Sequence, residues 1–446
     1  MGVEIRGDTN YIVNTFNIGK QEPPRISTEF AACFACRTRR FPSLSGPKTA
    51  CPLSASQDAR RALPASDTQL DPKARPRPRG HVIDDETIAV VGAGAWGTAL
   101  AITAAQAGRT VRLWAREPEV AEAIRTNGEN TPFLPDRPIP PEVTASNDLG
   151  AALDGAAIVL LVVPSQFLRG TAASVEAHLA AGVPVVICAK GIERGSGKLM
   201  STIIEEEMPG RPFGVLSGPT FAEELAAGLP TAVTIASDFD DDTDPDQSLA
   251  ARVALSLGSP ILRPYISNDV TGVEVGGAIK NVIAIACGIA TGLGFRSNTR
   301  AALIARGLEE MKSLAEALGG KRETVTGLSG IGDLMLTCSS EQSRNMSFGM
   351  ALGRGQTAEE ALAGKVQVVE GVVNTLSVTD LARSLGIELP ICEAMRAVLE
   401  DGMDISEAVA SLIGRPLKAE PKALDMALPH PAGEEEIAAH VEEITR

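Results

Sequence analysis

The sequence lacks the long apolar segment that a membrane-spanning helix requires. Such a helix needs about 18 consecutive apolar residues, and no run in the 446 residues reaches that length. The longest apolar stretches, 156–164 and 183–189, have the length of strands and are typical of buried strands in a parallel sheet. The sequence therefore predicts no integral membrane segment.

Positively charged residues are also fewer than negatively charged ones. The chain has 41 Lys and Arg against 56 Asp and Glu, which gives a formal net charge of −15. A negative surface disfavours binding to nucleic acid and to anionic membranes. We therefore expect no nucleic-acid partner.

The charge is unevenly distributed along the chain. Residues 1–80 carry a formal charge of about +6, which leaves about −21 for the remainder. This basic leader is rich in Pro, Ser and Arg and has no sustained apolar periodicity, so we predict that residues 1–84 are disordered. An organelle transit peptide and a start codon placed upstream of the true one both remain open, because the leader contains more acidic residues than transit peptides do.

Cysteine, with seven residues, forms no metal or disulfide pattern. Cys33 and Cys36 make a single CxxC with Cys51 nearby, and the nearest histidine is His81, so a zinc site lacks a fourth ligand at suitable spacing. The acidic run 238–246 is predicted to be a solvated loop. We predict no metal site and no disulfide. The remaining cysteines lie singly in apolar segments, as reduced buried thiols do: Cys188, Cys287, Cys338 and Cys392.

A glycine-rich turn, Gly-Ala-Gly-Ala-Trp-Gly at 92–97, lies between a strand and a helix. An apolar strand precedes it at 87–91, a helix-forming run follows as far as Gly108, and a second strand is expected at 110–114. This order is that of a dinucleotide-binding βαβ unit. In such a unit Gly92 permits the tight turn, Gly94 lets the backbone approach a pyrophosphate, Gly97 lets the helix pack on the strand, and the helix N-terminus offers N–H groups to the phosphates.

The chain changes character near residue 270. Before it, strands and helices alternate, which predicts a doubly wound, mostly parallel α/β Rossmann domain at 85–268. After it, helical spacing dominates and predicts an all-α substrate-binding and catalytic domain at 269–420, followed by an acidic tail at 421–446. A cleft between the domains is the expected place for chemistry. The expected strands are 87–91, 110–114, 157–163, 184–189, 214–217, 231–236 and 261–265.

Two lysines are candidates for proton transfer, because none of the four histidines lies in a glycine-rich segment of functional character. Lys190 follows an apolar strand and precedes Gly191, so we expect it at the carboxyl edge of the sheet, where ligands bind. Lys280 lies in an otherwise apolar helix, after Gly277 and Ala278. Burial can lower the pKa of a lysine enough for acid–base work; a lysine that extends to the surface is the alternative interpretation of Lys280.

Six motifs in one order resemble those of bacterial-type NAD(P)-dependent glycerol-3-phosphate dehydrogenases, over about 86–418. They are Gly-Ala-Gly-Ala-Trp-Gly-Thr-Ala-Leu at 92–100, Ala-Lys-Gly at 189–191, Ser-Gly-Pro-Thr-Phe-Ala at 217–222, Gly-Ala-Ile-Lys-Asn at 277–281, Gly-Ile-Gly-Asp-Leu at 330–334 with Gln-Ser-Arg-Asn at 342–345, and Val-Glu-Gly at 369–371.

The resemblance implies roles for individual residues. Lys280 would transfer the proton at the secondary alcohol, and Asp333 would hold this lysine near the substrate. Substrate binding is implied for Lys190, Gly218, Thr220, Lys280, Asp333, Ser343, Arg344 and Asn345, with Arg344 binding the phosphate through its planar donors. Cofactor binding is implied for Gly92, Gly94, Ala95, Trp96, Gly97, Lys190, Ala222, Arg344, Val368 and Glu370.

Arg116 bears on the choice between NAD and NADP. It stands just past the second strand, where an NAD-selective site often carries an acid bonded to the ribose hydroxyls, whereas an arginine can accept a 2′-phosphate. Glu117 is the next residue, so the pattern leaves the preference open. We expect NADP to be used alongside NAD.

The resemblance implies a reversible hydride transfer between sn-glycerol 3-phosphate and dihydroxyacetone phosphate, which supplies glycerol 3-phosphate for phospholipid synthesis. It also implies a cytoplasmic homodimer. Two alternatives remain at this point. One is another helical-domain dehydrogenase, of the 3-hydroxyacid or 6-phosphogluconate type. The other is a dinucleotide-binding regulator without catalysis, although such a protein would be expected to lose Lys280 and Asp333.

Overall fold

The computed structural model describes residues 86–239, 244–363, 369–418 and 427–445. The predicted disordered leader, 1–84, lies outside these residues, as does the middle of the acidic run at 238–246. The four cysteines of the described part are free and buried.

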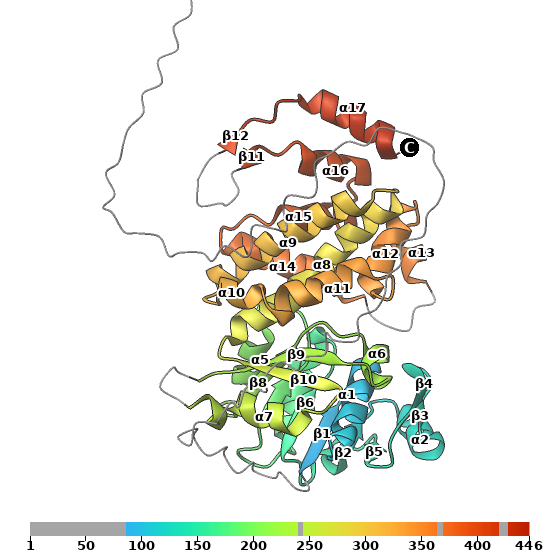
Figure 1. Ribbon diagram of the computed structural model, residues 1–446, viewed down its shortest axis with the longest axis vertical. Helices are drawn as coiled ribbons and strands as arrows, with labels where there is room; N and C mark the ends of the chain where they lie inside the picture. Colours follow the sequence, from blue (N-terminus) through green and yellow to red (C-terminus); the bar gives the residue numbers. More distant parts are fainter. Residues whose placement is uncertain (1–85, 240–243, 364–368, 419–426, 446) are drawn as a thin grey trace, which may run out of the picture. The chain divides into compact units, whose positions relative to one another are not determined.

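An eight-stranded sheet forms the core of the N-terminal domain, in the order β10-β9-β8-β7-β6-β1-β2-β5 (Figure 1). Its strands from β5 to β8 are parallel, β8 pairs with β9 in antiparallel fashion, and β9 and β10 are parallel to each other. The strands are β1 (Thr87–Val91), β2 (Thr110–Trp114), β5 (Val143–Ser146), β6 (Ile158–Leu161), β7 (Val185–Ile187), β8 (Phe213–Ser217), β9 (Thr231–Ser237) and β10 (Leu262–Ser267).

Helices cover both faces of this sheet, which confirms the predicted doubly wound α/β class. One buried cluster joins the sheet to α1, α2 and α7, for example through Leu100 and Val253. The opposite cluster includes α3, α4 and α5, for example through Leu153 and Ile203. The helices are α1 (Ala95–Gln106), α2 (Pro118–Asn127), α3 (Leu149–Leu153), α4 (Leu168–Glu176), α5 (Met200–Glu207), α6 (Ala222–Ala226) and α7 (Leu249–Leu257).

The strand order reverses at β1, because β2 lies on one side of it and β6 on the other. Ligands of open α/β sheets bind beyond the carboxyl ends of the strands at such a point. The glycine turn follows β1 directly. Lys190 follows β7, and Gly218 follows β8, so three motifs found in the sequence are placed at this one edge of the sheet.

The C-terminal part is helical, as predicted, and is built around α8 (Figure 1). Every residue of α8 from Gly272 to Ala290 is buried, and α9, α11, α12 and α14 pack against it. The elements are α8 (Val270–Gly292), α9 (Ser297–Ala317), α10 (Arg322–Val325), a π-helical turn at Leu328–Gly332, α11 (Asp333–Ser339), α12 (Arg344–Gly353), α13 (Ala358–Leu362), α14 (Glu370–Ser384), α15 (Pro390–Leu399) and α16 (Ile405–Ile413).

Among the helices that the structure describes, α8 alone has the length and hydropathy that a membrane span would need. Its apolar segment is fully buried inside the protein. The apolar character of this helix is therefore that of a core helix, surrounded by other helices rather than by lipid.

Glycines bring α8 and α12 into close contact. A Cβ on Gly288 would lie 2.2 Å from the carbonyl oxygen of Met346, and one on Gly349 would lie 2.2 Å from the carbonyl oxygen of Ile285. Side chains at these positions would force the helices apart. The contact fixes the start of α12, which carries a predicted substrate-binding segment, against the helix that carries Lys280.

Part of the predicted acidic tail is folded. Helix α17 (Glu434–Thr445) packs on α16 and buries Ile437 and Val441, and the Ser406 and Thr445 hydroxyls are hydrogen bonded across the two helices. Two short strands, β11 (Leu417–Lys418) and β12 (Ala427–Leu428), form an antiparallel pair.

Candidate active site

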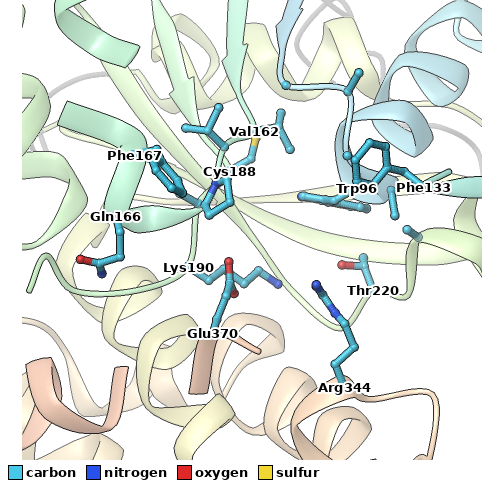
Figure 2. Close-up of a pocket in the computed structure, with 18 of the residues that line it drawn as sticks. Trp96, Phe133, Val162, Gln166, Phe167, Cys188, Lys190, Thr220, Arg344 and Glu370 are labelled. Atoms are coloured by element: carbon cyan, nitrogen blue, oxygen red, sulfur yellow. The ribbon is translucent and has the colours of Figure 1, made fainter. Parts of the chain in front are cut away.

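A cavity of about 1060 Å³ lies between the carboxyl edge of the sheet and helices α8, α12 and α14. Residues from both domains point into it in Figure 2, where the Lys190 and Arg344 side chains extend into the same space with Thr220 beside them. Thirteen of the residues singled out in the sequence line this cavity: Gly92, Gly94, Ala95, Trp96, Arg116, Lys190, Thr220, Ala222, Lys280, Ser343, Arg344, Asn345 and Glu370.

The glycine turn has the shape needed to receive a dinucleotide. Gly92 has φ +119°, and a Cβ there would lie 2.4 Å from the carbonyl oxygen of Val162. Gly94 faces open space, with nothing within 4 Å of the position of a Cβ. Helix α1 begins at the next residue, so its first amides lie beside this bare backbone. Such a cradle at a helix N-terminus suits a pyrophosphate.

One buried carboxylate joins the two candidate lysines. Asp333 is completely buried, and its Oδ1 accepts a hydrogen bond from Lys280 Nζ at 2.6 Å while its Oδ2 accepts one from Lys190 Nζ at 2.7 Å. Lys190 Nζ also donates to the carbonyl oxygen of Gly218 at 3.1 Å. The lysine of the sheet edge and the lysine of α8 are therefore held side by side at the cavity wall.

Small residues make this arrangement possible. A Cβ on Gly277 would lie 3.2 Å from Cγ of Lys190, so the bare backbone of α8 leaves room for the lysine that follows β7. A Cβ on Gly276 would lie 2.5 Å from the carbonyl oxygen of Ser329, in the π-helical turn that leads into Asp333. The glycines preceding Lys280 thus let Lys190 and Asp333 approach it.

The buried setting shifts the pKa of each group in this cluster. Burial lowers the pKa of Lys280 to about 8, against the opposing attraction of Asp333 and together with repulsion from Lys190. Burial alone would raise the pKa of Asp333, but attraction to both lysines outweighs it and holds that pKa below its usual range. Asp333 is therefore an anion at neutral pH, and Lys280 can gain or lose a proton near pH 8.

A second hydrogen-bonded network connects α8, α12 and α14. Asn345 Nδ2 donates to Asn281 Oδ1 at 2.9 Å, and the amide of Gly371 donates to Asn345 Oδ1 at 2.9 Å. Asn281 Nδ2 in turn donates to Glu370 Oε2 at 3.4 Å. Burial raises the pKa of Glu370, although Arg344 and the two lysines oppose this effect. The network orients the helix ends that border the cavity.

Three predicted site residues, Gly97, Gly218 and Asp333, do not line the cavity themselves. Gly97 is packed into the turn, where a Cβ would be 1.8 Å from the carbonyl oxygen of Gly92. Gly218, with φ +156°, presents its carbonyl oxygen to Lys190, and Asp333 lies beneath the lysines. Val368 lies outside the described residues.

Thr337 belongs to the cluster but was not singled out in the sequence. Its hydroxyl accepts a hydrogen bond from Lys280 Nζ at 3.2 Å and donates to the carbonyl oxygen of Asp333 at 2.6 Å. Thr337 follows Asp333 by four residues, which places the two side chains on one face of a helix. This spacing was the signal in the sequence that could have identified Thr337. Other lining residues without such a signal include Phe133, Val162, Val163, Pro164, Gln166 and Phe167.

Arg116 lines the cavity beyond β2 as an exposed side chain paired with its neighbour. Its Nε lies 2.9 Å and its Nη2 lies 2.5 Å from Oε1 of Glu117. A 2′-phosphate would therefore have to compete with Glu117 for this guanidinium. Within the described residues no group of three His, Cys, Asp or Glu side chains is placed to hold a metal ion.

Comparisons with known proteins agree with this geometry. The family model described as NAD-dependent glycerol-3-phosphate dehydrogenase N-terminus matches residues 87–243, and that of the C-terminus matches residues 269–410. Glycerol-3-phosphate dehydrogenase (NAD(P)+) of Caulobacter vibrioides is 51% identical over 335 residues, which cover 75% of this chain and 99% of that protein. The corresponding enzyme of Rhodospirillum rubrum is 50% identical and covers 75% and 93%.

A solved structure shows the same fold. The crystal structure of glycerol-3-phosphate dehydrogenase from Coxiella burnetii is 40% identical, has a TM-score of 0.70 and covers 74% of this chain and 99% of that one. The family models together span well over half of the sequence. The chain belongs to the NAD-dependent glycerol-3-phosphate dehydrogenase family.

Proposed function

We propose that this protein catalyses the reversible, NAD(P)-dependent interconversion of dihydroxyacetone phosphate and sn-glycerol 3-phosphate. Family membership supports the reaction. The observation that carries the assignment to particular residues is the buried Lys190–Asp333–Lys280 cluster at the cavity wall, with Arg344 facing the same space.

Lys280 is the proton-transfer group in this proposal. As an ammonium ion it donates a proton to the C2 oxygen of dihydroxyacetone phosphate, and as a neutral amine it accepts the proton of the C2 hydroxyl in the reverse direction. When bound, the nicotinamide supplies the hydride to C2 or accepts it from C2. Asp333 and Thr337 orient the lysine, and the pKa of about 8 lets it work in both directions near neutral pH.

Lys190 and Arg344 bind the substrate phosphate. Both line the cavity, and a planar guanidinium suits a phosphate group because it can donate two parallel hydrogen bonds. Ser343 and Asn345 lie on either side of Arg344 at the start of α12, where Ser343 Oγ accepts from the amide of Met346 at 3.3 Å and caps the helix. Thr220 borders the same space, and Gly218 acts through the carbonyl oxygen that holds Lys190.

The cofactor would be held mainly by the N-terminal domain. Gly92, Gly94 and Ala95 with the start of α1 bind the pyrophosphate, while Gly97 lets that helix approach the turn. In this proposal the further contacts come from Trp96, Arg116, Lys190, Ala222, Arg344, Val368 and Glu370.

A substrate panel tests the function directly. We expect the purified protein to oxidise NADH and NADPH with dihydroxyacetone phosphate, followed at the nicotinamide absorbance band. We expect no comparable turnover of 3-hydroxyacids or 6-phosphogluconate. Turnover of one of these compounds, without turnover of dihydroxyacetone phosphate, would refute the assignment.

The cellular context follows from the reaction. The product, glycerol 3-phosphate, is the backbone precursor of phospholipids, and we propose that the protein supplies it in the cytoplasm. We also propose a homodimer. Light scattering after size-exclusion chromatography measures the mass of the protein in solution. The mass of a single chain would contradict the proposed homodimer.

A further inference from the structure

A small hairpin beside the main sheet contacts the glycine turn. It consists of β3 (Glu129–Asn130) and β4 (Leu134–Pro138). Asn130 is completely buried, and its Nδ2 donates to the carbonyl oxygen of Ala93 at 2.8 Å and to Thr98 Oγ1 at 2.7 Å. Ala93 is the second residue of the glycine turn, and Thr98 lies in the first turn of α1. One amide group thus connects the turn to the helix that follows it.

The carbonyl half of this amide has no partner in the part of the chain that the structure describes. Oδ1 of Asn130 is buried and accepts no hydrogen bond from the described residues. A buried polar atom without a partner destabilises the folded state, and an apolar side chain of similar size would avoid that cost. The two donations from Nδ2 are therefore what this asparagine provides.

The bond to Ala93 determines which way the next amide points. The Ala93–Gly94 peptide is planar and trans, so its N–H points away from its carbonyl oxygen. Because Asn130 holds that oxygen on the buried side, the N–H of Gly94 is directed to the other side. Gly94 lines the cavity and has open space in front of it.

The hairpin is itself held in place where its second strand begins. Leu134 is completely buried in the core of the N-terminal domain. Phe133 lines the cavity, and Figure 2 shows its ring beside Trp96 of the glycine turn. Asn130 therefore acts from a fixed element.

We propose that Asn130 is a positioning residue for the dinucleotide, one that orients the Gly94 amide toward the cofactor pyrophosphate by holding the carbonyl oxygen of Ala93. The inference rests on the proposed function in one respect, namely that the glycine turn binds the dinucleotide. Asn130 itself does not touch the cofactor.

The test compares NADH affinity with stability in Asn130→Ala. We expect the Kd for NADH, measured by fluorescence titration without substrate, to rise roughly ten- to hundredfold, the range for loss of one hydrogen bond to a charged group. The KM for NADH should rise with it. The KM for dihydroxyacetone phosphate and kcat at saturating NADH should stay within about threefold of wild type, because the substrate groups are untouched.

Leu257→Ala is the matched control for stability. Leu257 is a completely buried residue of α7 that does not line the cavity, so its truncation lowers Tm and leaves the Kd for NADH unchanged. If Asn130→Ala does not fold, Asn130→Leu serves instead, since it removes the amide that donates to the carbonyl oxygen of Ala93 and nearly keeps the side-chain volume. A several-fold rise in Kd for this variant supports the proposal.

The outcomes separate this inference from the proposed function. A wild-type Kd for NADH retained in Asn130→Ala, or in Asn130→Leu where that variant is used, would overturn the positioning role. A Kd that rises equally in Leu257→Ala would show that the effect follows general destabilisation, and would overturn it as well. Failure of the wild-type protein to bind NADH would instead contradict the proposed function.

Discussion

Replacing Asp333 by Asn removes the carboxylate to which both lysines are hydrogen bonded. The carboxylate is completely buried, with Lys280 Nζ 2.6 Å from one oxygen and Lys190 Nζ 2.7 Å from the other. An asparagine has nearly the same shape, but it offers one acceptor oxygen and turns an NH2 group toward the other ammonium ion. The variant therefore isolates the effect of charge from that of size.

The structure indicates how large the effect should be. Breaking a buried ion pair by removing one partner costs about 3–5 kcal/mol of stability. Part of this cost is avoided, because Lys280 can release its proton: burial already lowers its pKa to about 8, and Asp333 is the strongest influence opposing that effect. We expect the pKa of Lys280 to fall further in Asp333→Asn, so that the lysine is largely neutral at pH 7.

The consequence differs between the two directions of the reaction. Reduction of dihydroxyacetone phosphate needs the protonated lysine, so it should weaken as pH rises through about 8 in the wild type. Oxidation of glycerol 3-phosphate needs the neutral amine and should strengthen over the same range. In Asp333→Asn both transitions should move to lower pH, and reduction at pH 7 should fall by about 10²–10⁴, the usual contribution of a positioned general acid.

Initial rates in both directions between about pH 4.5 and pH 10 measure this shift, with saturating cofactor so that only the loaded enzyme is compared. Thermal unfolding of the same samples measures the stability loss. Transitions that stay at the wild-type pH in the variant would refute the reasoning, even if the overall rate falls.

Three further predictions concern cofactor choice, helix packing and pH-dependent stability. Arg116→Ala should lower kcat/KM for NADPH about tenfold or more and leave kcat/KM for NADH within about twofold, because a charge-assisted bond to the 2′-phosphate is lost. Glu117→Gln should instead raise kcat/KM for NADPH relative to NADH. An unchanged ratio of the two kcat/KM values in either variant would contradict the role of Arg116 in binding the 2′-phosphate. Gly288→Ala should lower the free energy of unfolding by about 1–3 kcal/mol in a denaturant titration and raise the KM for dihydroxyacetone phosphate. The reason is that the new Cβ would lie 2.2 Å from the carbonyl oxygen of Met346 and displace the start of α12. Wild-type stability in this variant would contradict the close contact between the two helices. Burial raises the pKa of Glu274 from 4.5 to about 7, so the folded state binds this proton more tightly than the unfolded state does. The difference contributes about 3 kcal/mol to the free energy of unfolding. This contribution is fully present below pH 4.5 and is lost as the pH rises through about 7. Glu274→Gln should flatten that part of a Tm-against-pH curve, and a curve of unchanged slope would show that the carboxyl group does not titrate there.

Local signals made much of the fold predictable. The turn at 92–97 could be recognised because the strand, the glycines and the helix all lie within twenty residues, and each has its own sequence signature. The change to helical spacing after residue 270 was equally local. The hairpin of β3 and β4 gave no such signal, because Pro135 and Pro138 within five residues are typical of a loop.

The cluster at the cavity wall depends on contacts that are distant in sequence. Lys190 and Asp333 are 143 residues apart, and Lys280 and Asp333 are 53 apart. The resemblance implied that Asp333 holds Lys280, but a sequence pattern cannot show that the same carboxylate also holds Lys190. Asn130 was missed for the same reason, since its partner Ala93 is 37 residues away and the bond goes to the backbone.

The central claim is that Lys280 transfers the proton in the reduction of dihydroxyacetone phosphate. The most direct test is the turnover of this substrate by Lys280→Ala with NADH and with NADPH, alongside NADH binding to show that the cofactor site is intact. Our account predicts a loss of kcat of about 10²–10⁴ with either cofactor and an NADH affinity close to that of the wild type. Near-normal turnover by Lys280→Ala would contradict it.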